Sequence, residues 1–258
     1  MRIGEALKEF SANSVVLAEK QQRVYDAGVA EGRAQGGYTE GFDAGRQAEY
    51  DAFWDVLQNY GSRTNYRYAF EGWGAEYIRS KYKVIPTSGV YNMFYDNPNL
   101  KKVEAAYFDL SQVPYSGNAQ TFSYFLGGCP KLEEIEDIGL VPNQSYTYFA
   151  AWDYALKKVA CIRLNADTNV EFMLYGCTAL EDVTIEGEIG KGGINLYQSK
   201  NLKHDSIVSF INALSNNTSG LAITFSAEAV NNAFEGGSTG SEWLDLLATK
   251  SNWTISLV

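Results

Sequence analysis

Few residues in this 258-residue chain could perform acid–base or nucleophilic chemistry. The chain has one histidine, His204, and three cysteines, Cys129, Cys161 and Cys177. A Ser–His–Asp or Cys–His arrangement would have to use His204, which stands in the polar run 203–206, a predicted turn that enters a helix. A solvated or helix-capping histidine is therefore the favoured interpretation. The odd number of cysteines and the absence of C-x-x-C spacing predict neither a zinc site nor a disulfide framework.

Motifs that hold nucleotides or catalytic zinc are also absent from the sequence. There is no GxxxxGK[ST], no GxGxxG after a predicted strand, and no HExxH. We therefore expect a protein that is not an enzyme and that uses no cofactor and no metal ion.

Charge and hydropathy exclude two further classes of protein. Lys and Arg number 21 and Asp and Glu number 31, which gives a formal net charge of −10. Because nucleic-acid surfaces need clustered positive charge, no nucleic-acid partner is expected. No apolar run approaches the ~18 residues of a membrane helix, so no membrane insertion is expected. Glu5 and Glu9 interrupt the N-terminal region where an export signal would have an apolar core, so we predict no signal peptide.

Two sets of residues could bind a partner without catalysis. The first is an aromatic run in which some members must be core and exposed members could stack on sugar rings. It comprises Tyr146, Tyr148, Trp152 and Tyr154. The second set occupies outward positions of predicted strands and has more carboxylates than lysines, which favours a basic partner or a hydrated glycan. It comprises Lys102, Glu104, Glu134, Glu136, Lys158, Asp182 and Thr184, with Ala160 among them. A ladder of alternating charges that gives solubility and strand register is an equal alternative for this set.

Both sets lie in a segment that repeats itself. The repeat is anchored at intervals of 32, 24, 24 and 22 residues by Leu100, Leu132, Leu156, Leu180 and Leu202. Three positions before the anchors stand Asn97, Cys129, Asp153, Cys177 and Ser199. Three positions after the first four stand Val103, Ile135, Val159 and Val183. The pattern predicts coils in which the small or polar residue bonds the backbone and a short strand pairs in parallel with the next coil, so that stacked coils share one core.

The repeat alignment also constrains the cysteines. Cys129 and Cys177 occupy the same repeat position two coils apart, which predicts a separation of roughly 10 Å from ~4.8 Å between neighbouring strands. That distance exceeds the reach of a disulfide. We therefore predict that the cysteines are reduced core residues.

Residues 91–202 resemble the BspA-type leucine-rich repeat family, whose repeats read approximately F-x-x-C-x-x-L-x-x-I-x-I. The long first interval departs from the family pattern and predicts an insertion around 115–120. Residues 203–258 are similar to the helix, strand, helix and strand that close such arrays, with an amphipathic helix over 201–214. The resemblance implies an α+β fold in which a short leucine-rich-repeat solenoid with parallel β-strands ends in a C-terminal cap.

Residues 1–58 predict a helical, coiled-coil-like stalk. An apolar seam at spacings of three and four is followed by glycines every four residues, which would let another backbone approach closely. Gly36 and Gly37 could instead break the region into two short helices, and we expect both features together. The seam and the stripe comprise Ile3, Leu7, Phe10, Leu17, Val24, Gly28, Gly32, Gly41 and Gly45. Since this region has no core of its own, we expect it to form a homo-oligomer, a trimer first of all, or to dock on a larger particle. The aromatic-rich residues 59–90 predict an N-terminal cap on the repeats.

The glycine-punctuated helix and the run 49–55 are similar to proteins encoded by bacteriophages and prophages of gut bacteria. This resemblance implies a non-enzymatic virion protein, of the tail, fibre or surface decoration, that is assembled in the host cytoplasm. It implies contacts with other virion proteins through 1–58 and with a host surface protein or glycan through the repeats. The alternative is a cytoplasmic or cell-surface protein-interaction module of a bacterium or prophage.

Overall fold

The computed structural model of the chain describes residues 70–72, 74, 76–78, 83–115 and 121–258. The chain divides into two units, Met1–Arg63 with Arg79–Lys83, and Thr64–Ile78 with Val84–Val258. The described residues belong to the second unit, apart from Lys83. The predicted stalk over 1–58 lies outside the described residues, as do 59–69, 73, 75 and 79–82 of the predicted cap and 116–120 of the predicted insertion.

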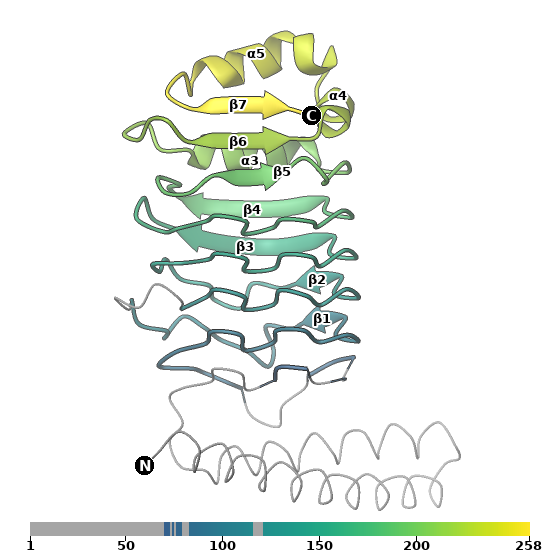
Figure 1. The fold of residues 1–258 in the computed structure, drawn as a ribbon, viewed down its shortest axis with the longest axis vertical. Helices are drawn as coiled ribbons and strands as arrows, with labels where there is room; N and C mark the ends of the chain where they lie inside the picture. The colour runs from purple at the N-terminus through teal and green to yellow at the C-terminus, as the bar shows by residue number, and fades with distance from the viewer. Residues whose placement is uncertain (1–69, 73, 75, 79–82, 116–120) are drawn as a thin grey trace, which may run out of the picture. The chain divides into compact units, whose positions relative to one another are not determined.

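The second unit is a mixed α/β structure in which the chain winds into stacked coils (Figure 1). Its first sheet is parallel and follows the order β1-β2-β3-β4. The four strands are β1 (Lys102–Val103), β2 (Glu134–Ile135), β3 (Lys158–Leu164) and β4 (Asp182–Gly187). Val103 pairs with Ile135, which pairs with Val159, which pairs with Val183. The predicted repeat alignment and its parallel pairing are therefore confirmed.

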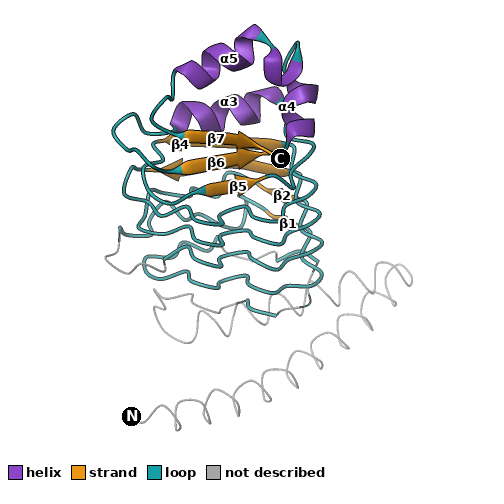
Figure 2. Cartoon of the chain, turned by 45° about the horizontal axis from the view of Figure 1, so that its top comes forward, coloured by secondary structure: helices purple, strands orange, loops and turns teal. Residues whose placement is uncertain are grey.

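A second parallel sheet and the helices complete the C-terminal end of the stack. The strands, in the order β5-β6-β7, are β5 (Ile194–Leu196), β6 (Ala222–Phe225) and β7 (Thr254–Leu257). The helices are α3 (His204–Ala213), α4 (Ala227–Ala233), the 3₁₀ turn η1 (Gly237–Thr239) and α5 (Ser241–Ala248), and they gather at one end in Figure 2. The predicted order of helix, strand, helix and strand omitted α4 and η1. The Ser226 hydroxyl, which accepts a hydrogen bond from the Ala229 amide, caps this short helix of weak apolar periodicity.

The repeat anchors form the core. Leu100, Leu132, Leu156 and Leu180 have no exposed area, and Leu202 is 2% exposed. Rings from successive coils also stack inside the unit, among them Phe125 on Phe149 with centroids 5.6 Å apart. Because each coil buries its apolar side only against its neighbours, the coils must fold together.

The small or polar position of each repeat ties neighbouring coils together through their backbones. The Asn97 amide donates to the Phe70 and Phe94 carbonyls, and the Cys129 and Cys177 thiols donate to carbonyls of the preceding coil. The Ser199 hydroxyl donates to the Cys177 carbonyl at 2.9 Å. All three cysteines are free and buried, as predicted.

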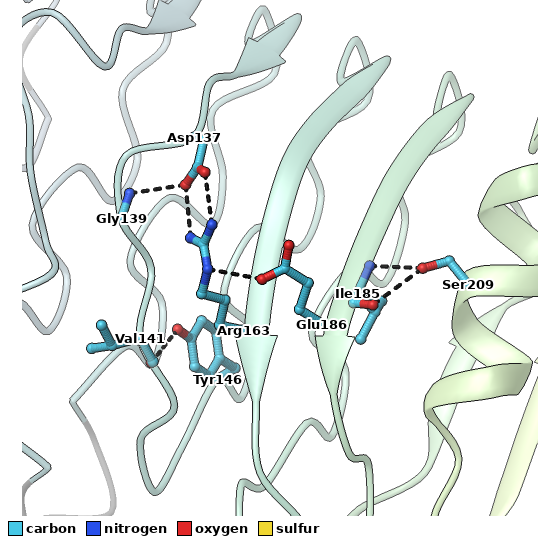
Figure 3. A network of polar contacts seen from close by, with 8 residues as sticks. All are labelled: Asp137, Gly139, Val141, Tyr146, Arg163, Ile185, Glu186 and Ser209. Atoms are coloured by element: carbon cyan, nitrogen blue, oxygen red, sulfur yellow. Dashed lines mark hydrogen bonds and ion pairs between the residues drawn. The ribbon is translucent and has the colours of Figure 1, made fainter.

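Helix α3 takes the place of a strand beside β4 and covers its open edge. The Ser206 hydroxyl accepts from the Val183 amide at 2.8 Å and donates to the Glu181 carbonyl at 3.0 Å. One turn further on, the Ser209 hydroxyl accepts from the Ile185 amide at 2.8 Å (Figure 3). Hydroxyls spaced three residues apart on one helical face thus satisfy the strand groups that a further coil would have paired.

Candidate functional site

The outward residues of the first sheet form a ladder of ion pairs that crosses three coils. Lys102, Glu134 and Lys158 stand in register on β1, β2 and β3. The Lys102 ammonium lies 2.8 Å from one Glu134 oxygen, and the Lys158 ammonium lies 3.1 Å from the other. Lys102 also pairs with Glu136 at 2.6 Å, and Asp182 pairs with Lys203 of the helical cap at 2.7 Å.

Most charged side chains of the set predicted on the strand face therefore form ion pairs within the molecule. Hydrogen bonds from Lys102 hold the pKa of the Glu134 and Glu136 carboxyls below their usual values. Glu104 and Ala160 are half-buried, and Thr184 is exposed. The structure thus places Lys102, Glu134, Lys158 and Asp182 in register along one row of the sheet, in the alternating arrangement that sets strand register.

A second charged network, which sequence reasoning missed, lies further along the same strands. The Arg163 guanidinium on β3 donates to both oxygens of Asp137 at 2.8 Å and to Glu186 on β4 at 3.0 Å (Figure 3). The bidentate contact holds the pKa of the Asp137 carboxyl below its usual value. Register could have revealed one half of this network, since Arg163 pairs directly with Glu186.

The four residues of the predicted aromatic run do not form one platform. Tyr146 is wholly buried, and its hydroxyl donates to the Val141 carbonyl at 2.8 Å. Tyr148 and Trp152 are half-buried and stack on each other at 5.2 Å. Tyr154 is 53% exposed. The expectation that some members are core is confirmed for Tyr146, and only Tyr148 and Trp152 contact each other at the surface.

Tyr148 and Trp152 belong instead to a longer row of half-buried rings, which we call the aromatic strip. Its centre is a stack in which Tyr148 lies 4.8 Å from Tyr124, 4.9 Å from Phe172 and 5.2 Å from Trp152, with interplanar angles of 20° or less. Four further rings extend it toward both ends of the stack, namely Tyr91, Tyr95, Tyr175 and Tyr197. The strip therefore crosses five successive coils, and all eight rings remain partly exposed.

The backbone beneath the strip is strained at equivalent positions of successive coils. Tyr124, Tyr148 and Phe172 have φ of 52°, 55° and 57°, in the left-handed region that bulky residues rarely occupy. Such a conformation costs about 1–2 kcal/mol per residue. Asn92 stands at the equivalent position of the first coil with φ 54°, and asparagine tolerates this region better. Trp152 has φ 65° where neighbouring coils have Gly128 and Gly176.

The single histidine is held between two carboxylates in the C-terminal cap. Nδ1 of His204 lies 2.9 Å from Asp205 and Nε2 lies 2.7 Å from Glu242 at the start of α5. These hydrogen bonds raise the pKa of the imidazole, because both contacts favour the cation. In the imidazolium form that these contacts favour, both nitrogens donate, which leaves no lone pair for general-base chemistry. The predicted capping role is wrong, because Lys203 is the N-cap of α3 and no side chain bonds the helix there, whereas the partly exposed His204 ring fits the solvated alternative.

Within the described part of the chain, no group of three or more His, Cys, Asp or Glu residues could hold a metal ion. None of the helices described there is sufficiently long and apolar to cross a bilayer. Comparison of the chain with protein-family models, with curated proteins and with solved structures finds no match.

Proposed function

We propose that this chain is a non-enzymatic attachment protein in which a leucine-rich-repeat stack presents a binding surface. In this proposal it is a virion-associated protein of a phage tail, fibre or surface decoration, and the stack contacts the host. The observation that carries the proposal is the aromatic strip, eight rings across five coils that folding leaves partly exposed. Aromatic surfaces of this extent on a folded domain are typical of binding sites.

A non-enzymatic role is supported by the state of the reactive side chains. Both ring nitrogens of His204 face carboxylates. Burial raises the pKa of the Cys129 and Cys177 thiols well above the usual value, so neither is poised as a thiolate nucleophile. Catalysis needs an acid, a base or a nucleophile that can reach a substrate. The two thiols are buried, and both ring nitrogens of the partly exposed His204 are already hydrogen-bonded.

Leucine-rich repeats are supported by the regular register of β1 to β4 and by the buried anchor leucines. The virion context and a trimeric stalk over 1–58 rest on the sequence resemblance. In the proposed arrangement the stalk joins the protein to other virion components, and the repeats remain available to the host surface.

Virion association is the test of this function. Phage particles induced from a lysogen that encodes the chain are purified on a density gradient and analysed by quantitative mass spectrometry. We expect the chain to co-purify with the major capsid protein at constant stoichiometry across the particle peak. A chain found only in the cytoplasmic fraction would contradict the proposal and favour the interaction module.

A further inference from the structure

We propose that the aromatic strip binds a neutral polysaccharide that runs along the stack of coils. The inference rests on the proposed attachment function and names the class of ligand. It is supported by the periodicity and the chemistry of the strip and by the negative charge around it.

Three rings of the strip, Tyr124, Tyr148 and Phe172, repeat at the period of the coils, and a polymer of identical sugar units repeats in the same way. Neighbouring parallel strands lie ~4.8 Å apart, so the four intervals from Tyr95 to Tyr197 span about 19 Å, which is several sugar residues. Such a ligand makes equivalent contacts with successive coils. The surface of a folded protein partner without repeats offers no matching translational repeat.

The strip also offers the two kinds of contact that a sugar ring needs. The stacked rings of Tyr124, Tyr148 and Phe172 cover each other's faces, so they offer ring edges and the tyrosine hydroxyls. Tyr95 and Tyr175 are turned by 88° and 84° from their stacked neighbours, so their planes run along the stack. Apolar sugar faces lie against rings of this orientation, and sugar hydroxyls bond the phenolic hydroxyls and the Gln198 amide, which already donates to Tyr197 at 3.0 Å.

Charge selects a neutral ligand over an acidic one. The strip itself carries no charge, and the exposed carboxylates Asp96 and Glu171 directly adjoin Tyr95 and Phe172 in the sequence. The chain as a whole has a formal charge of −10. A polyanionic polysaccharide would meet like charge at Asp96 and Glu171.

The strained residues indicate that evolutionary selection retains the aromatic rings themselves. Asn92 adopts the same left-handed conformation in the first coil, so the backbone path does not require an aromatic residue there. Strain that is repeated in three successive coils points to a function of the side chains it presents.

The test is native affinity electrophoresis of the full chain in gels that contain dextran, yeast mannan or laminarin, with alginate as the anionic control. The strip variant Tyr124→Asn/Tyr148→Asn/Phe172→Asn gives all three coils the residue of the first coil. Trp152→Gly is an independent strip variant. It introduces the residue that the neighbouring coils have at the equivalent position, Gly128 and Gly176. Tyr115→Asn, an exposed tyrosine outside the strip, is the matched control.

We expect at least one neutral polysaccharide to retard the wild-type chain and Tyr115→Asn, and alginate to retard neither. The strip variant should bind at least about tenfold more weakly, since three aromatic contacts with the sugar are lost together. If thermal melting shows that the triple variant is unfolded, the loss of retardation in folded Trp152→Gly decides the matter.

Three results would overturn the inference: no retardation by any of the neutral polymers, retardation by alginate alone, or equal retardation of the wild type and the folded strip variants. Failure of the attachment function looks different. A chain that is absent from virions yet retarded through its strip would refute the virion role and leave the ligand assignment intact.

Discussion

Asp153 offers a sharp test of how the repeat stack is stabilised. It occupies the small-residue position of its coil with no exposed area, and its Oδ1 accepts from the Cys129 amide at 2.6 Å. Oδ2 is buried and makes no hydrogen bond. Burial raises the pKa of this carboxyl well above its usual value. We therefore predict that Asp153 is a neutral acid in the folded protein and that Asp153→Asn stabilises the chain at neutral pH.

The magnitude follows from proton linkage. Unfolded Asp ionises near pH 3.9, so between that pH and the raised folded pKa the folded state binds one more proton than the unfolded state. The contribution of Asp153 is fully present below the unfolded pKa and is lost as pH rises, with a slope of about 1.4 kcal/mol per pH unit. For a chain of this size that slope corresponds to about 3–6 °C in Tm per unit. Asparagine does not titrate, so Asp153→Asn removes this pH dependence of the stability. Its side-chain amide can also donate to a backbone carbonyl, as the amide of Asn97 does.

Urea unfolding of the wild type and Asp153→Asn at pH 5, 6 and 7 measures the difference between the two slopes. Other titrating groups are common to both proteins and cancel in that difference. Asp167→Asn, on an exposed turn, is the control and should follow the wild type. Equal pH slopes for the wild type and Asp153→Asn, or a less stable variant at pH 7, would refute the assignment of a neutral buried acid.

Three further predictions concern the anchors, the sheet edge and the histidine bridge. Replacement of any one buried anchor by alanine should cost ~2–5 kcal/mol in urea unfolding, and unchanged stability in all of Leu132→Ala, Leu156→Ala and Leu180→Ala would contradict the core assignment. Ser206→Ala leaves the Val183 amide without its acceptor and should cost about 1–3 kcal/mol, with faster hydrogen exchange at that amide; unchanged exchange would speak against edge capping by α3. Hydrogen bonds to Asp205 and Glu242 raise the pKa of His204, so its stabilisation is complete below about pH 6.5 and is lost as pH rises through the folded pKa. Thermal melting of His204→Gln relative to the wild type between pH 5.5 and 8.5 should show the difference shrink with rising pH, and a constant difference would contradict the charged bridge.

Spacing alone predicted the parallel sheet and its register. A leucine that recurs every 22 to 32 residues with a β-branched residue three positions later leaves one plausible alignment, and Val103, Ile135 and Val159 pair as that alignment requires. The edge capping by Ser206 was not predicted, because it depends on how a helix approaches β4. Periodicity gives no information on that approach.

The candidate site was predicted only in part. Tyr148 and Trp152 were identified, whereas the extension of the strip through Tyr124 and Phe172 was not. The recurrence of Tyr124, Tyr148 and Phe172 at 24-residue intervals was a signal in the sequence. An alternating-strand model, however, gives no orientation for a bulky residue at positive φ, so it could not place these rings beside Tyr148.

The central claim is that the aromatic strip, and not the charged strand face, attaches the protein to its target. Saturable binding of the labelled full chain to cells of the host bacterium, compared for two surface variants, tests it most directly. We predict that Lys158→Gln on the strand face binds as the wild type does, and that Tyr124→Asn/Tyr148→Asn/Phe172→Asn binds at least about tenfold more weakly. Wild-type affinity in the folded strip variant, together with loss of binding in Lys158→Gln, would contradict the claim.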